Sequence, residues 1–116
     1  MSHEVPAGWP EGVPSPSDEE FEERVVTWLL DLAPPQWRNS ALRNFPGALA
    51  WSVEQFISGQ QVTARAAYSR ARSALANDQH LAVEPAMAAW QAHGVALAHS
   101  LRQIGMVRRA LGAEGA

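Results

Sequence analysis

The side chains that most often carry chemistry in proteins are few in this chain. It contains no cysteine, which excludes a disulfide scaffold, a thiolate metal site and a cysteine nucleophile. Its four histidines stand at positions 3, 80, 93 and 99. On a helix, His93 and His99 would point about 120° apart, so they cannot chelate one ion as an i,i+4 pair does. We therefore expect no metal site and no cofactor.

Glu54 is the carboxylate whose position suggests an ion pair. It is the only acid between Asp31 and Asp78. In an antiparallel hairpin that turns near residue 80, it would lie within reach of Arg102 and Arg109. We predict a buried structural pair between Glu54 and one of these arginines. General-base catalysis would need a second catalytic group and a pocket, and the sequence shows neither, so we expect no enzyme.

All nine basic residues are arginines, the residue type best suited to bidentate phosphate contacts. Arg65 and Arg72 are seven residues apart and share one helical stripe, as do Arg102 and Arg109. These four side chains are the candidates for contact with nucleic acid. In the hairpin register the two pairs lie near opposite ends, so a monomer has no continuous basic track. The alternative is an ordinary solvated helix face, and no known nucleic-acid-binding motif is present.

Composition and charge indicate a globular protein with two differently charged parts. Apolar residues make up 47% of the 116 residues and charged residues 18%, which is too apolar for disorder throughout. Residues 1–31 contain eight acids and one arginine, whereas residues 32–116 contain four acids and eight arginines. The asymmetry suggests an acidic first helix lying on a more basic hairpin. Alternatively, the acidic segment shields a basic surface that serves another partner.

The sequence shows no signal for export or for membrane insertion. The first twenty residues lack a basic start followed by an apolar run, and no apolar stretch approaches the roughly 20 residues that span a bilayer. We therefore expect a cytoplasmic protein without a membrane partner.

Residues 1–17 are expected to form an extended N-terminal arm. They contain four prolines and two glycines, a density that forbids a helix and favours polyproline-like backbone. Trp9 stands in the middle of this segment. Two interpretations are open: the arm is a mobile tail, or it docks Trp9 on its own domain or on a neighbouring subunit.

Helical signals run from residue 18 to residue 112, which predicts an all-α fold with a single helical domain. Four helices are expected, at about 18–33, 36–43, 46–76 and 84–111. The first should begin with a capping box of Ser17 and Glu20 and end before two prolines. Gly112 should cap the last helix, and residues 113–116 should fray.

The two long helices should form an antiparallel hairpin with a heptad-like seam. Residues with spacings of three and four mark this seam in the last helix, at Met87, Trp90, Gly94, Leu97, Leu101 and Ile104. Small residues such as Ala64 and Gly94 would let the two backbones approach closely.

The first helix is too short to cover such a hairpin. At 1.5 Å per residue it measures ~24 Å, against ~45 Å for each long helix. An uncovered seam would be a large apolar patch for a monomer, and a second copy would cover it by completing a four-helix bundle. The alternative is that the first helix and the short second helix hide enough of the seam.

These features predict a non-enzymatic helical module for protein–protein interaction or oligomerisation. We expect a homodimer that uses the seam residues, with its bundle or its Trp9 arm presented to a protein partner that the sequence does not identify. The alternative hypothesis is a nucleic-acid-associated protein that uses the arginine patches of the hairpin.

Overall fold

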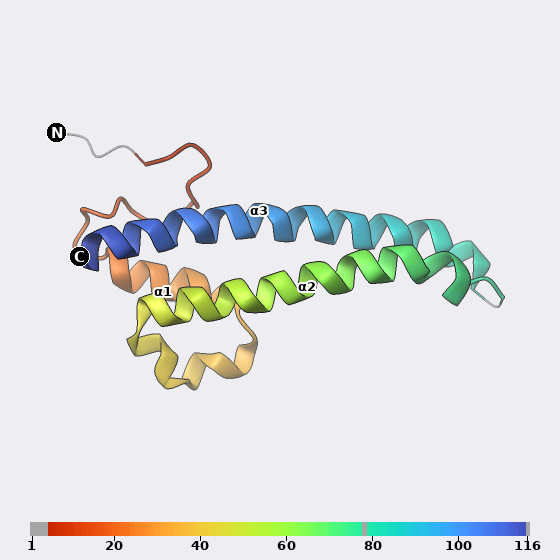
Figure 1. Ribbon diagram of the computed structural model, residues 1–116, viewed down its shortest axis with the longest axis horizontal. Coiled ribbons are helices and arrows are strands. Elements are labelled where there is room, and N and C mark those ends of the chain that lie inside the picture. Colours follow the sequence, from red (N-terminus) through yellow and green to blue (C-terminus); the bar gives the residue numbers. More distant parts are fainter. Residues whose placement is uncertain (1–4, 78, 116) are drawn as a thin grey trace. The chain divides into compact units, whose positions relative to one another are not determined.

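The fold is entirely helical in the part of the chain that the structure describes. A computed structural model describes residues 5–77 and 79–115, and none of them lies in a strand. The elements, with η marking a 3-10 helix, are α1 (Phe21–Leu32), η1 (Pro35–Asn39), η2 (Ala41–Asn44), α2 (Pro46–Ala74), η3 (His80–Ala82) and α3 (Val83–Gly115) (Figure 1). The all-α prediction is confirmed.

Contacts within the chain divide it into two compact units, which we describe separately. The first unit comprises Met1–Phe56 and Arg102–Ala116, and so contains α1, η1, η2, the start of α2 and the end of α3. The second unit, Ile57–Leu101, is a helical hairpin in which the rest of α2 and the start of α3 run antiparallel (Figure 1). The expected single domain over residues 18–112 stays a prediction, because helices α2 and α3 each run through both units.

Helix α1 is shorter than the predicted 18–33, because its capping box does not form. Glu20 occupies the N-cap position, and the N-terminus has no side-chain cap. The Asp18 carboxylate instead accepts a hydrogen bond from the backbone N–H of Glu20 at 2.8 Å, and this local bond competes with a helical start at residue 18. At the other end, Ala33 is extended before the two prolines, as expected for a residue that precedes proline.

The short helix predicted at 36–43 is instead a pair of 3-10 helices, η1 and η2. Ser40 separates them because its backbone is extended, with φ −78° and ψ 149°. Its hydroxyl accepts a hydrogen bond from the Leu42 N–H at 3.1 Å and so caps η2. In η1 the half-buried Trp37 ring packs against Phe56, with 6.1 Å between the ring centroids.

The long helices begin near the predicted positions but end elsewhere. Helix α2 starts at Pro46, as predicted, and ends at Ala74 instead of residue 76. Helix α3 continues through Gly112, which therefore does not cap it. Among the described residues, only Gly8 and Gly12 have a positive φ. The backbone of residues 113–115 is helical, and residue 116 lies outside the described residues.

The core of the first unit is built mainly by α1, the start of α2 and the end of α3. Two large side chains from each of α1, α2 and α3 are completely buried: Val25 and Leu29, Leu49 and Val53, Ile104 and Val107. The apolar stripe of α1 thus meets the starting turns of α2 and the final turns of α3. This arrangement is the only place where the described residues bury large side chains completely.

The N-terminal arm is docked on the first unit. The Trp9 ring stacks on Phe21 with 6.3 Å between centroids, and its indole N–H donates a hydrogen bond to the Val13 carbonyl at 2.8 Å. Pro10 and Val13 are buried. Of the two interpretations of the arm, the structure shows the one in which Trp9 docks on its own chain.

Two glycine-centred turns bend the arm away from the extended course that its prolines suggest. Gly8 and Gly12 have φ angles of +87° and +83°, a region that side chains rarely tolerate. Their carbonyls accept hydrogen bonds from the Gln103 amide at 3.1 Å and from the Arg24 guanidinium at 3.2 Å. The turns therefore aim backbone acceptors at α3 and α1.

Replacing Trp9 with alanine should destabilise the protein by about 2 kcal/mol, because the change removes a stacked, half-buried indole and its hydrogen bond. Urea unfolding followed by far-ultraviolet circular dichroism measures this loss. The matched control is Trp51→Ala, which removes an indole that is 52% exposed and should cost under about 1 kcal/mol. Equal losses from the two variants would contradict the docked arm.

Candidate interaction surface

The hairpin of the second unit contains a groove between its two helices. The groove has a volume of about 600 Å³. Each helix supplies five lining residues: Gln61, Ala64, Arg65, Tyr68 and Ser69 from α2, and Trp90, Gln91, Gly94, Val95 and Ala98 from α3. Such a hollow between two packed helices is a common place for a side chain of another helix to enter.

Small residues bring the two helices together at the groove. Ala64 is buried, and a Cβ added to Gly94 would lie 4.0 Å from the Ala64 Cβ, an ordinary contact distance. The predicted approach of small residues is therefore found at this pair. The larger Tyr68 and Trp90 also line the groove, and the Trp90 ring meets His93 edge-on with 6.0 Å between centroids.

The lining of the groove suits binding better than acid–base chemistry. Arg65 is its only charged residue, and no carboxylate or histidine lines it. The remaining polar groups are neutral amides and hydroxyls beside aromatic and aliphatic side chains. Among the side chains that commonly act as general acids or bases, only the Tyr68 hydroxyl lines the groove.

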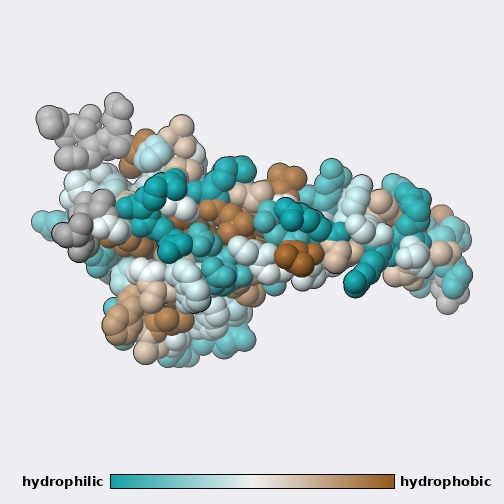
Figure 2. Space-filling view, in the orientation of Figure 1, coloured by the Kyte–Doolittle hydropathy of each residue, from teal (hydrophilic) through white to brown (hydrophobic). Residues whose placement is uncertain are grey.

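The hairpin also exposes large apolar side chains and buries none completely. Val62 is 65% exposed, Val95 66% and Leu81 84%. The most buried side chain of the unit belongs to Ala64, at 2%. Figure 2 shows brown, hydrophobic side chains set among teal and white ones along this hairpin.

The predicted interface residues divide between the interior and the surface. Leu97 and Ile104 are buried within the chain itself, so these two side chains are not available to a partner. The physical reason is that their repeat is the seam through which α3 packs inside its own chain. Four others are half-buried: Met87, Trp90, Gly94 and Leu101.

On the α2 side of the groove, the sequence indicated Ala64 and Arg65 for other roles. It did not single out the other three α2 lining residues, or Val95 on α3. The predicted seam supplies only Trp90 and Gly94 to the groove lining. One signal was present, since Val62 and Val95 are apolar residues outside the seam repeat. An apolar residue outside the packing stripe of an amphipathic helix indicates a second contact face.

Glu54 forms the predicted ion pair, but with a different arginine and near the surface. The Arg108 guanidinium donates a hydrogen bond to the Glu54 carboxylate at 2.7 Å. The side chains are 40% and 27% exposed, so the pair is not buried. Arg108 follows the seam residue Ile104 by four residues, which continues the seam spacing and places it towards Glu54 of α2. Arg102 makes no salt bridge with any described residue. Arg109 lines a small hollow beside the pair.

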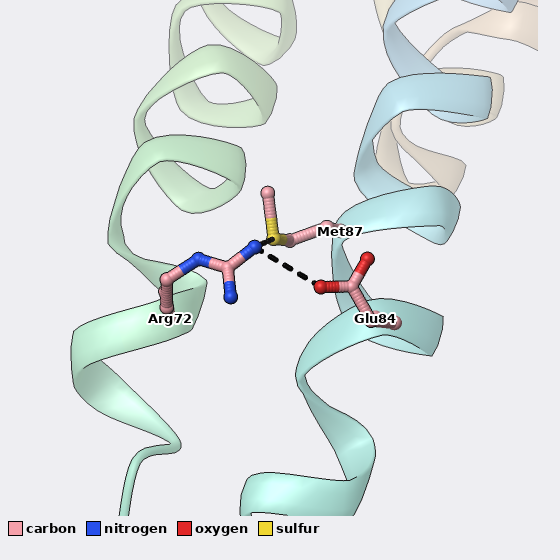
Figure 3. A network of polar contacts seen from close by, with 3 residues as sticks. All are labelled: Arg72, Glu84 and Met87. Carbon is pink, nitrogen blue, oxygen red and sulfur yellow. Dashed lines mark hydrogen bonds and ion pairs between the residues drawn. The ribbon is translucent and has the colours of Figure 1, made fainter.

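The four arginines proposed for nucleic acid are divided between the two units. In the second unit, Arg72 donates to the Glu84 carboxylate at 3.0 Å and approaches the sulfur of Met87 at 3.7 Å (Figure 3). Arg65 lines the groove instead. Arg102 and Arg109 belong to the first unit. Contact with nucleic acid therefore stays an untested prediction.

The acidic segment does not pair with the arginines of the long helices among the described residues. Three salt bridges are present there: Arg38–Asp31, Arg72–Glu84 and Arg108–Glu54. The acids at positions 18–23 take part in none of them and are exposed. Within the described part of the first unit, the acids at the start of α1 thus form no salt bridge with the arginines of α3.

Two other kinds of site can be assessed within the described ranges. No group of three histidines or carboxylates there could hold a metal ion. None of the described helices has the length and apolar character that crossing a membrane requires.

Comparison of the chain with protein-family models, with curated proteins and with solved structures finds no match in any of the three. A functional proposal therefore has to rest on the geometry and chemistry of the groove.

A double-mutant cycle on Glu54 and Arg108, each changed to alanine, should show a coupling of about 0.5–1 kcal/mol, as expected for a partly exposed pair. Urea unfolding of the four proteins measures it, and added salt should reduce it. The control cycle combines Glu54→Ala with Arg102→Ala and should show no coupling. Equal coupling in both cycles would contradict the observed pairing.

Proposed function

We propose that this protein is a non-enzymatic helical module for protein–protein interaction, with the hairpin Ile57–Leu101 as its docking surface. One observation carries the proposal: the hairpin completely buries no large side chain and has an apolar groove along one face. Two helices alone cannot enclose a core, so their inner surfaces stay partly open to water. A docked partner helix would remove that surface from water.

The gain from docking would come from a few exposed side chains. Val95 and Tyr68 line the groove and are 66% and 39% exposed. Complete burial of one such side chain is worth roughly 1.5–3 kcal/mol. Several of these contacts, with the small Gly94 and Ala98 allowing close approach, are what a helix needs to bind a groove through a few anchor positions.

The polar groups of the groove support recognition. Gln61, Ser69 and Gln91 line it and can donate and accept hydrogen bonds. Arg65 adds a single positive charge. A lining that mixes apolar side chains with a few polar groups is typical of protein–protein interfaces.

The other surface considered from the sequence, the Trp9 arm, is less suitable. Trp9 already stacks on Phe21 and bonds to Val13 inside the first unit. Presenting it to a partner would first require breaking these contacts. The hairpin needs no such rearrangement.

A cross-linker placed in the groove should capture a partner, whereas one placed outside should not. The chain has no cysteine, so Val95→Cys can be labelled uniquely with a benzophenone maleimide and returned to an extract of the native cells. Illumination should then give adducts of discrete mass. The control is Ala96→Cys, at an exposed neighbour that does not line the groove.

Two outcomes of that experiment would contradict the proposed docking surface. One is the lack of any discrete adduct from position 95. The other is the same set of adducts from positions 95 and 96, because it would mean that capture reflects exposure and not the groove.

A further inference from the structure

We infer that the groove is occupied by the same hairpin of a second copy of this chain, so that four helices form a bundle. The inference rests on the proposed function, because it names the partner of that docking surface. It moves the predicted dimer contact from the seam of α3 to the face lined by Tyr68, Trp90 and Val95.

The hairpin by itself buries few large apolar side chains. Five of its side chains are buried, and two of these are alanines: Ile57, Ala64, Ala71, Val83 and Leu97. A second copy has the same shortage on the same face. Packing the two faces together gives both copies a shared interior, which is how four-helix bundles are stabilised.

The groove also has a shape that can fit a second copy of itself. A two-fold interface uses the same patch on both partners, so one patch must contain both protrusions and hollows. Here Val95 and Tyr68 protrude beside the small residues Ala64 and Gly94, all within one groove. The protrusions of one copy can therefore enter the hollow of the other.

The lining of the groove carries little charge. Arg65 is the only charged residue of the lining, and Arg72, farther along α2, is already paired with Glu84. A strongly charged groove would repel its own copy and select a partner of opposite sign. Arg65 is exposed, so one such charge per copy imposes only a small penalty on self-association.

The area of the hairpin face is large enough for a weak dimer interface. The unit contains roughly 18 residues of each helix, a length of about 27 Å at 1.5 Å per residue. Two helices of about 10 Å diameter make a face of roughly 540 Å² before its ridges are counted. A standard interface buries about 800 Å² per partner, so the face fits a weak dimer better than a permanent one.

The test is the mass of the intact protein in solution as a function of concentration. Sedimentation equilibrium and light scattering should show a shift from 12.6 kDa towards about 25 kDa, with a midpoint on the order of 10 µM. Val95→Glu places a charge inside the proposed contact and should raise the dissociation constant roughly 100-fold or more. The control Ala96→Glu adds the same charge outside the groove and should leave it unchanged.

A second variant guards against a folding defect in the first. Tyr68→Glu tests the same groove from α2 and should also give the monomer, with the helical circular dichroism of the parent. A parent chain that stays at 12.6 kDa up to roughly 1 mM would overturn the inference, as would undiminished dimers of both groove variants.

These results separate the inference from the proposed function. Adducts from position 95 that contain another protein, together with a monomeric parent chain, overturn self-association and leave the docking surface in place. A dimer that Ala96→Glu breaks as readily as Val95→Glu overturns the inference too, because the groove would then not be the contact.

Discussion

Apolar side chains can be removed completely from water only when they are enclosed from several directions, and a pair of helices leaves one direction open. In the first unit α1 supplies the third direction, and Leu29, Leu49 and Ile104 are completely buried there. In the second unit the described residues form no third helix longer than η3, which has three residues and buries none of them. The large side chains of Ile57 and Leu97 keep 4% and 6% of their surface exposed there. The difference between the two units follows from this one constraint.

The groove on the uncovered face of the hairpin is lined by small and by aromatic side chains. Ala64 and Gly94 hold the helices close, and the larger Tyr68 and Trp90 border the hollow beside them. No carboxylate or histidine lines the hollow, and its lining combines apolar side chains with neutral polar groups and the single charge of Arg65. The proposal of an interaction module comes from that combination.

The polar contacts of side chains add little to the stability of the fold, but some of them determine where a segment of the chain lies. The ion pairs Arg38–Asp31 and Arg72–Glu84 have side chains that are more than half exposed, and exposed pairs of this kind contribute at most about 1 kcal/mol. The hydrogen bonds of the N-terminal arm have a larger structural role. The carbonyls of Gly8 and Gly12 accept hydrogen bonds from α3 and α1, which orient the arm so that Trp9 covers Phe21. Burial of apolar surface thus stabilises the first unit, and these hydrogen bonds fix the position of the arm on it.

By itself the sequence determined the properties that depend on near neighbours: an all-helical chain, a break at two prolines, a helix that starts at Pro46 and small residues where Ala64 meets Gly94. Local signals can also compete. The Asp18 carboxylate accepts the Glu20 N–H that the predicted Ser17 cap would have bound, and α1 starts at Phe21 instead of residue 18. Only the tertiary structure decided that Arg108 pairs with Glu54, that Trp9 folds back on Phe21, and that Leu97 lies inside while Val95 lies outside. These outcomes depend on the rotation of one helix against another, and a rotation of a few tens of degrees exchanges neighbouring side chains while leaving the periodicity of the sequence unchanged.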